Sequence, residues 1–231
     1  MNKYLRFVLP AIAIVFLVNA SVGVVSAQDV LRQILKRMDE NNKSLTSLKG
    51  SIKMAKHDSV LNETDISEGS ISYIPGRSQK QIYIRIDWAK PVVEHLAVAN
   101  GQYVLYRPKL KQAITGKVDS AKGNAKTGGA LAFMSMSQAQ LRENYDVKYV
   151  ADETVAGGVK TFHLLLTPKN ASGYKSADLW VDANGMPVQA KVVEKNNDTT
   201  TVLLSAIQKN ATVKASAFKI SPPKDVKIVQ G

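Results

Sequence analysis

Two Asn-Gly dipeptides constrain the fold of this 231-residue chain more than any other feature. The pairs at positions 100–101 and 184–185 each lie between runs in which apolar and polar residues alternate. An Asn-Gly pair in that setting is the strongest short-range signal of a β-hairpin, because both residues readily adopt positive φ. The alternation starts at Gly69 and is clear over residues 82–88, where three isoleucines and Trp88 share one face. The sequence therefore predicts antiparallel, half-buried strands.

Further runs of this kind extend through the second half of the chain. They predict strands over 92–99, 102–106, 159–167, 177–182, 188–195 and 199–208, and a strand end with a turn over 151–158. With residues 82–88 this makes eight or more strands, and no crossover helix separates them. The predicted sheet is therefore antiparallel and strongly curved or barrel-like.

The N-terminus has the pattern of an export signal. Lys3 and Arg6 precede an apolar run over residues 7–18, and Val25-Ser26-Ala27 then has the small-x-small pattern of a cleavage site. The alternative is a retained anchor, but the apolar run is shorter than the roughly 18 residues that read as a membrane span. We expect residues 1–27 to be a cleaved signal peptide and residues 28–231 to form a single domain.

Composition excludes several classes of function. The chain has no cysteine and only three histidines, so thiolate nucleophiles, disulfide frameworks and zinc fingers are excluded and a histidine-based metal site is not expected. Its formal net charge is +12, but the lysines are spread along the chain rather than gathered with arginines and aromatic residues. That distribution argues against a nucleic-acid partner. It leaves open a solvated basic surface or attraction to anionic headgroups or an acidic partner.

Two segments predict helices. Asp29 can cap a helix of about three turns, because apolar residues recur at three- and four-residue spacing over 30–38. We expect this helix to pack on the sheet rather than lie on a membrane surface. Residues 122–144 contain a glycine-rich stretch followed by good helix formers and two methionines. This second segment is either a lid or a helix that closes one end of the sheet.

Constellations that would support catalysis are absent from the sequence. Glu94 and His95 point to opposite faces of a strand, so they cannot act together. Asp178 and Asp182 share a face but lie roughly 13 Å apart along a strand, so we expect them to be solvated surface charges. The sequence therefore predicts neither an enzyme nor a cofactor.

The order of these features resembles the periplasmic outer-membrane lipoprotein carrier family (LolA-like). The stretch IRIDWAKPVVEHLAVANGQYVLYRPKLKQA is similar to the family's strand, proline, Asn-Gly hairpin, aromatic strand and YxPxxxQA exit. The family pattern is matched there by Pro91, Asn100, Gly101, Tyr103, Tyr106, Pro108, Gln112 and Ala113. TGGALAFMSMSQAQLRENYDV resembles the lid helix and the strand after it, and FHLLLTPK and LWVDANGMPVQAKVV continue the similarity. The chain ends on the family's F-x-x-x-P-P-x-x-V pattern, with Phe218, Pro222, Pro223 and Val226.

The resemblance implies a fold and a function. The fold would be mainly β with a helical lid, an incomplete antiparallel β-barrel covered by the N-terminal and lid helices. Such a protein would hold lipoprotein acyl chains in an apolar cavity, without covalent chemistry, and shuttle them from the inner to the outer membrane. Its partners would be acylated lipoprotein cargo, an inner-membrane ABC-type lipoprotein-releasing complex and an outer-membrane acceptor lipoprotein, and the protein would be a monomer. The alternative is a periplasmic lipid- or glycolipid-binding or sensor protein on the same half-barrel.

The strand face on which each side chain lies, together with the family resemblance, indicates the candidate site residues. We predict a lipid-binding cavity lined by Ile82, Ile84, Ile86, Trp88, Leu96 and Val98, with Leu164, Leu166, Leu179 and Val181 as weaker candidates. We predict lid residues Leu131, Phe133, Met134 and Met136. In the family an arginine before the apolar strand holds the lid shut. Arg77 and Lys80 lie near that place with shifted spacing, and they are the possible latch. Plain core packing is the alternative role for every cavity and lid residue.

Overall fold

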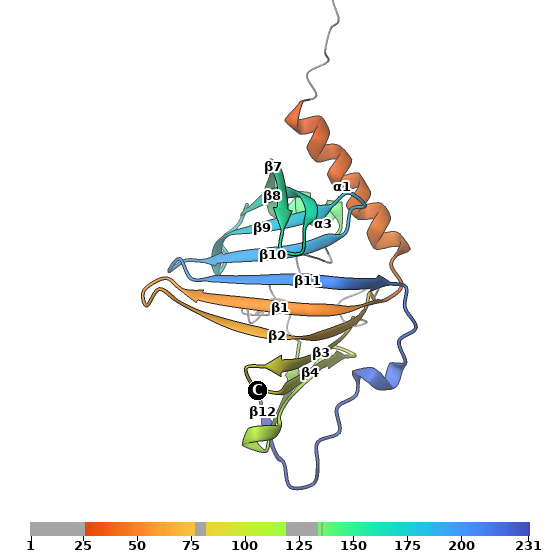
Figure 1. Cartoon of the computed structure of the whole chain (residues 1–231), viewed down its shortest axis with the longest axis vertical. Coiled ribbons are helices and arrows are strands. Elements are labelled where there is room, and N and C mark those ends of the chain that lie inside the picture. Colours follow the sequence, from red (N-terminus) through yellow and green to blue (C-terminus); the bar gives the residue numbers. More distant parts are fainter. Residues whose placement is uncertain (1–25, 77–81, 119–133, 135) are drawn as a thin grey trace, which may run out of the picture.

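The computed structural model describes residues 26–76, 82–118, 134 and 136–231. Most of these residues form one sheet, in which the strand order is β12-β6-β5-β4-β3-β2-β1-β11-β10-β9-β8-β7 (Figure 1). The strands are β1 (Leu48–Asp58), β2 (Glu63–Ile74), β3 (Tyr83–Lys90), β4 (Glu94–Ala99), β5 (Gln102–Arg107), β6 (Gln112–Lys117), β7 (Tyr145–Val155), β8 (Val159–Pro168), β9 (Tyr174–Asp182), β10 (Pro187–Glu194), β11 (Thr199–Lys209) and β12 (Lys227–Gln230). The helices are α1 (Ala27–Ser44) and α3 (Gln138–Asn144), with short 3-10 helices η2 (Pro108–Leu110) and η4 (Ala215–Phe218).

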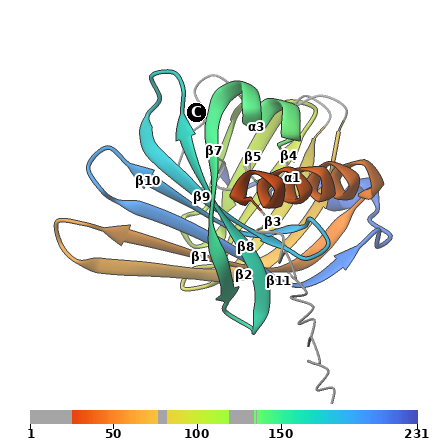
Figure 2. The same ribbon diagram turned by 90° about the horizontal axis from the view of Figure 1, so that it is seen from above.

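The sheet is open and curved. Its two ends, β12 and β7, do not pair with each other, and Figure 2 shows the sheet curving around α1 with α3 beside it. This confirms the predicted fold class, a mainly β half-barrel with helices over its open side. We call the side of the sheet that faces α1 the concave face, and the opposite side the outer face.

One strand corrects the prediction of a wholly antiparallel sheet. Every pair of neighbours is antiparallel except β12 and β6, which run parallel. Parallel neighbours need a long crossover connection rather than a hairpin. Here residues 210–226, which we call the C-terminal segment, supply it by running past β1 to β4 before β12 begins (Figure 1).

The predicted Asn-Gly hairpins are confirmed. Asn100 and Gly101 both have positive φ, at 52° and 73°, between β4 and β5. Gly185 has a φ of 80° between β9 and β10. Strand β1 and the part of β2 before residue 69 were not predicted; β1 also carries an irregularity in its pairing with β11, between Lys49 and Ser51.

Helix α1 is longer than predicted and begins earlier. Its N-cap is Ser26, whose side chain accepts a hydrogen bond from the Gln28 amide, whereas Asp29 lies in the first turn and pairs with Arg32. The helix also continues past Asn41 and Asn42 and ends at Ser44. Asn41 is 5% exposed and accepts a hydrogen bond from Lys209, so a tertiary contact stabilises the last turn.

Helix α3 carries the capping box that its sequence encodes. The Ser137 hydroxyl accepts from the Gln140 amide, and the Gln140 side chain accepts from the Ser137 amide. Among the described residues, no helix combines the length and apolar character that spanning a membrane requires.

Candidate functional site

The concave face carries one continuous apolar cluster. Helix α1 contributes Ile34, Leu35 and Met38, all at most 2% exposed. The sheet contributes buried side chains from strands on both sides of its centre: Ile52, Met54, Ile71, Ile86, Trp88, Leu164, Leu166, Leu179, Val181, Val192 and Val202. Fully burying one such aliphatic side chain is worth about 1.5–3 kcal/mol. The helix and the sheet are therefore held together chiefly by apolar contact.

The cavity residues predicted from β3 and β4 lie at different depths in this arrangement. Ile86 is fully buried and Trp88 is 7% exposed, whereas Ile84 and Leu96 are partly buried against the cluster. Val98 pairs with Ile84 across the two strands and is half-buried, as is Ile82. The structure thus brings these side chains to one region. Whether they contact a lipid stays a prediction.

The weaker candidates from β8 and β9 lie in the core of the concave face, and their role as cavity lining stays a prediction. Leu164, Leu166, Leu179 and Val181 are each fully buried in the cluster.

The described part of the predicted lid also reaches the cluster. Met134 is 8% exposed and belongs to it, and Met136 packs against it. Leu131 and Phe133 lie outside the described residues, as do the possible latch residues Arg77 and Lys80.

Two side chains of α1 hold the segment that leads into α3. The Asp39 carboxylate accepts a hydrogen bond from the Gln138 amide at 2.8 Å, and the Asn42 amide group donates to the Met136 carbonyl at 3.1 Å. An aspartate oxygen at the first amide of a helix also interacts favourably with the helix dipole. Neither of these two hydrogen bonds was predicted from the sequence. Their only signal was a short polar pair three residues apart on a predicted amphipathic helix.

Helix α1 is further fixed by the turn between β9 and β10. The Arg37 guanidinium donates to the Ala183 carbonyl at 3.4 Å and lies 5.8 Å from the ring centre of Phe162. A Cβ at Gly185 would collide with the α1 backbone at Arg37 and Met38. The turn therefore depends on glycine for two reasons, its positive φ and its close approach to the helix.

A hollow of about 270 Å³ opens between α1 and the strands β7 and β8. It is lined by Val30, Gln33, Ile34, Arg37, Tyr149, Asp152 and Phe162. The Tyr149 hydroxyl donates to Asp152 at 2.8 Å, and this bond to a carboxylate raises the pKa of Tyr149. The lining of the hollow therefore combines apolar side chains with polar and charged ones.

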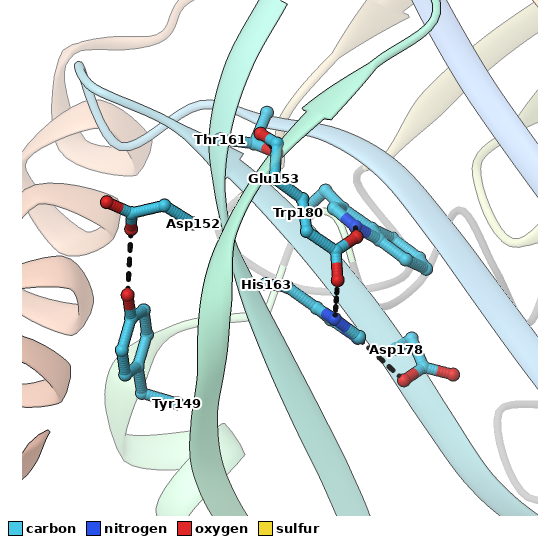
Figure 3. A network of polar contacts seen from close by, with 7 residues as sticks. All are labelled: Tyr149, Asp152, Glu153, Thr161, His163, Asp178 and Trp180. Atoms are coloured by element: carbon cyan, nitrogen blue, oxygen red, sulfur yellow. Dashed lines mark hydrogen bonds and ion pairs between the residues drawn. The ribbon is translucent and has the colours of Figure 1, made fainter.

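The outer face of β7, β8 and β9 carries a polar network instead (Figure 3). The His163 imidazole lies between two carboxylates, with Nδ1 2.8 Å from Glu153 and Nε2 2.8 Å from Asp178. Its ring stacks on Trp180 at a centroid distance of 4.5 Å, and the Trp180 indole donates to Glu153 at 2.7 Å. The hydrogen bonds from Trp180 and then His163 lower the pKa of Glu153, although desolvation opposes them.

This network corrects the expectation that Asp178 and Asp182 are solvated charges. The Asp178 side chain is only 15% exposed because it bonds His163. Asp182 accepts hydrogen bonds from the backbone amides of Asn184 and Met186 in the hairpin turn. Both aspartates therefore stabilise the sheet. Among the described residues, no group of three or more metal-ligating side chains is placed to hold an ion.

Glu94 and His95 have separate partners, as their predicted opposite facing requires. Glu94 pairs with Arg107, whereas His95 pairs with Asp87.

Comparison with known proteins identifies what this arrangement is similar to. The family described as "Outer membrane lipoprotein carrier protein LolA" matches residues 44–221. An outer-membrane lipoprotein carrier protein from Proteus mirabilis is 28% identical over 138 residues, which cover 58% of this chain and 60% of that protein. An outer-membrane lipoprotein carrier protein from Pseudomonas fluorescens is 27% identical over 138 residues, which cover 59% of this chain and 62% of that protein. The chain thus spans about three fifths of the length of these curated relatives.

A solved structure extends the similarity to the fold. An uncharacterized conserved protein from Thermus thermophilus superposes with a TM-score of 0.55 at 12% identity. The superposition covers 87% of this chain and 99% of that one.

Proposed function

This chain belongs to the LolA family of outer-membrane lipoprotein carriers, and from that membership we propose that it shuttles lipoproteins from the inner to the outer membrane by binding their acyl chains. The observation that carries the proposal is the apolar cluster of the concave face, with α1 and Met134 as its cover. Acyl chains need such a shelter in water, since each buried methylene is worth about 0.8 kcal/mol.

The proposed mechanism is displacement of the cover by the ligand. Ile84, Leu96 and Met136 are only partly buried, so they border the apolar cluster where it is accessible. Acyl chains entering there would replace contacts that the helices and the sheet now make with each other. No covalent step is part of the proposal, and no cofactor takes part. The direction of transfer follows from differences in affinity along the series of partners.

The proposed setting is the periplasm, which the protein would reach after removal of residues 1–27, a cleavage that also removes the α1 N-cap Ser26 and leaves Asp29 near the start of the helix. The proposed partners are the acylated cargo, an inner-membrane ABC-type releasing complex and an outer-membrane acceptor lipoprotein, without a nucleic acid, and the carrier would act as a monomer. The names of the curated relatives support the cargo class.

The test is a release assay. Spheroplasts carrying a labelled outer-membrane lipoprotein are incubated with the mature protein, and the supernatant is examined by native mass spectrometry. We expect a soluble one-to-one complex with acylated lipoprotein. Recovery of phospholipid or glycolipid alone would replace the proposal with a lipid carrier or sensor, and an empty protein would overturn it.

A matched pair of variants locates the binding face. Ile84→Glu places a charge at the partly buried border of the cluster, and we expect it to abolish cargo retention. Val159→Glu makes the same kind of change at an exposed position on β8, and it should retain cargo. Phe133→Glu tests the predicted lid in the same assay. Circular dichroism confirms that each variant keeps its β signal, and equal retention by Ile84→Glu and Val159→Glu would place the cargo elsewhere.

A further inference from the structure

A groove of about 430 Å³ lies on the other side of the sheet, between its outer face and the C-terminal segment. One wall comes from the first strands: Lys49 of β1 and Ser72 of β2 are paired in register. Their neighbours Leu48 and Ile71 are buried in the concave-face cluster, so strand alternation directs Lys49 and Ser72 outward. The groove is therefore separated from the proposed lipid-binding face by the thickness of the sheet.

The other wall is the C-terminal segment, which contributes Thr212, Val213, Lys214, Ser216 and Ala217. This wall is fixed at both ends. At its start the Ser47 hydroxyl donates to the Ala211 carbonyl, and the Asn210 side chain accepts from the Thr46 amide. At its end Phe218 is 3% exposed and packs on Tyr83, with a ring-centre distance of 5.6 Å.

The chemistry of the lining is that of an anion site. It offers two ammonium groups and three hydroxyls, and it contains no acidic side chain. Within the described residues, no carboxylate forms an ion pair with Lys49 or Lys214, whereas Lys53, Lys90 and Lys111 each have one. Arg85 of β3 is in register with Ser72 and also faces outward, and its guanidinium pairs with Asp87. His95 contacts the same carboxylate, so the negative charge of Asp87 is already compensated and does not oppose an anion in the groove.

The C-terminal segment and β12 strengthen the positive field around the groove. Residues 210–231 hold four lysines and a single acidic residue, Asp225, which is paired with Lys111. A surface with this balance attracts anions.

We propose that this groove binds a phosphate group, with Lys49 and Lys214 as its charged ligands and Ser72, Thr212 and Ser216 as hydroxyl donors. A phosphate monoester carries a charge of about −1.5 to −2 at neutral pH and three strong acceptor oxygens, which matches two ammonium groups and several hydroxyls. The group could belong to a lipid headgroup or to a soluble phosphate compound, since both present the same chemistry to the groove.

The first experiment titrates the mature protein with inorganic phosphate at constant ionic strength and follows binding by calorimetry. The double variant Lys49→Gln/Lys214→Gln should bind phosphate at least about tenfold more weakly, because it loses two charge-assisted contacts. The control Lys148→Gln/Lys160→Gln removes the same charge from exposed positions on β7 and β8, and it should bind as the wild type does.

A second variant keeps the result interpretable. Ser216→Glu adds a carboxylate to an exposed position of the groove lining, and it should also weaken phosphate binding. Matching thermal midpoints confirm that all variants are folded. The absence of phosphate binding by the wild type, or an equal loss in the control double variant, would overturn the site.

The source of the phosphate is decided by flotation with vesicles. Wild-type protein is mixed with phosphatidylcholine vesicles that contain or lack phosphatidic acid. Flotation only with phosphatidic acid, lost in Lys49→Gln/Lys214→Gln, supports the site and assigns it to a lipid headgroup. Phosphate binding without flotation supports the site and assigns it to a soluble phosphate compound.

Discussion

Each face of the sheet is covered by another part of the chain, α1 on the concave face and the C-terminal segment on the outer face, and the two contact the sheet in different ways. On the concave face, α1 packs through fully buried aliphatic side chains, and hydrogen bonds from Asp39 and Asn42 hold the segment leading into α3. On the outer face, the C-terminal segment is held at Asn210 and Ala211 and again at Phe218, and a polar groove lies between these two contacts. Apolar contact is non-directional and can be exchanged for acyl chains, whereas a groove of fixed charges selects a ligand by its charge.

The largest expected loss of stability concerns the C-terminal segment, which covers the outer face. Phe218→Ala removes the ring that anchors the C-terminal segment on Tyr83, and we expect it to lower the free energy of unfolding by about 4 kcal/mol. Chemical denaturation measures the loss, and limited proteolysis should cut within residues 210–226. Ile228→Ala, at a 63% exposed position of β12, is the control and should change stability little. A Phe218→Ala protein as stable as the control would show that the Phe218 ring does not anchor the C-terminal segment.

The next largest loss of stability is expected at the turn between β9 and β10, which holds α1 on the concave face. Gly185→Ala adds a Cβ where φ is 80° and where the α1 backbone leaves no room, so we expect a loss of about 3 kcal/mol. Gly157→Ala is the matched control, since Gly157 has a φ of 90° but no neighbouring atom within 4 Å of the added carbon. It should lose only about 1 kcal/mol from backbone strain. Equal losses in the two variants would mean that contact with α1 contributes nothing at Gly185.

A smaller effect is expected where α1 holds the segment before α3. Asp39→Ala removes the acceptor for the Gln138 amide, and we expect a loss of about 1.5 kcal/mol in unfolding free energy. The more specific readout is hydrogen exchange, in which the Gln138 amide should become less protected while the strands keep their protection. Glu40→Ala, at an exposed neighbouring position, is the control. Unchanged hydrogen exchange at the Gln138 amide would show that Asp39 does not attach α1 to the start of α3.

These contrasts also show what the sequence could predict. The hairpins at Asn100-Gly101 and Asn184-Gly185 were predictable because turn chemistry and alternation are local properties. The burial of Ile86 and Trp88 followed from the same alternation. The parallel pairing of β12 with β6 was not predictable, because it joins residues far apart in the chain and depends on where the C-terminal segment crosses the sheet.

The side-chain contacts between different helices and strands were also not predictable from the sequence. Periodicity placed Asp178 on a face of β9, but only the register of β8 brings His163 within 2.8 Å of it. The cap of α1 was placed at Asp29 because an aspartate before an apolar repeat is a common signal, whereas Ser26 caps the helix three residues earlier.

The smallest expected effect lies in the outer-face network around Glu153. The hydrogen bond from the Trp180 indole, and then that from His163, hold the pKa of the Glu153 carboxyl below its ordinary value of 4.5 in the folded protein. A group whose folded pKa is lowered contributes stability that is fully present above its unfolded pKa and is lost as the pH falls through the folded pKa. The wild type should therefore lose this contribution on acidification below about pH 4.5.

Glu153→Gln isolates that contribution, because the glutamine side chain can still accept from Trp180 but carries no charge. We expect its unfolding free energy to fall less steeply than that of the wild type as the pH drops below the ordinary glutamate value. Glu143→Gln, which removes an exposed carboxylate from α3, should keep the wild-type slope. The effect is small because the Glu153 side chain is 41% exposed and solvent screens it. Identical slopes in all three proteins would mean that the network stabilises the sheet through packing of His163 of β8 on Trp180 of β9 and not through the charge of Glu153.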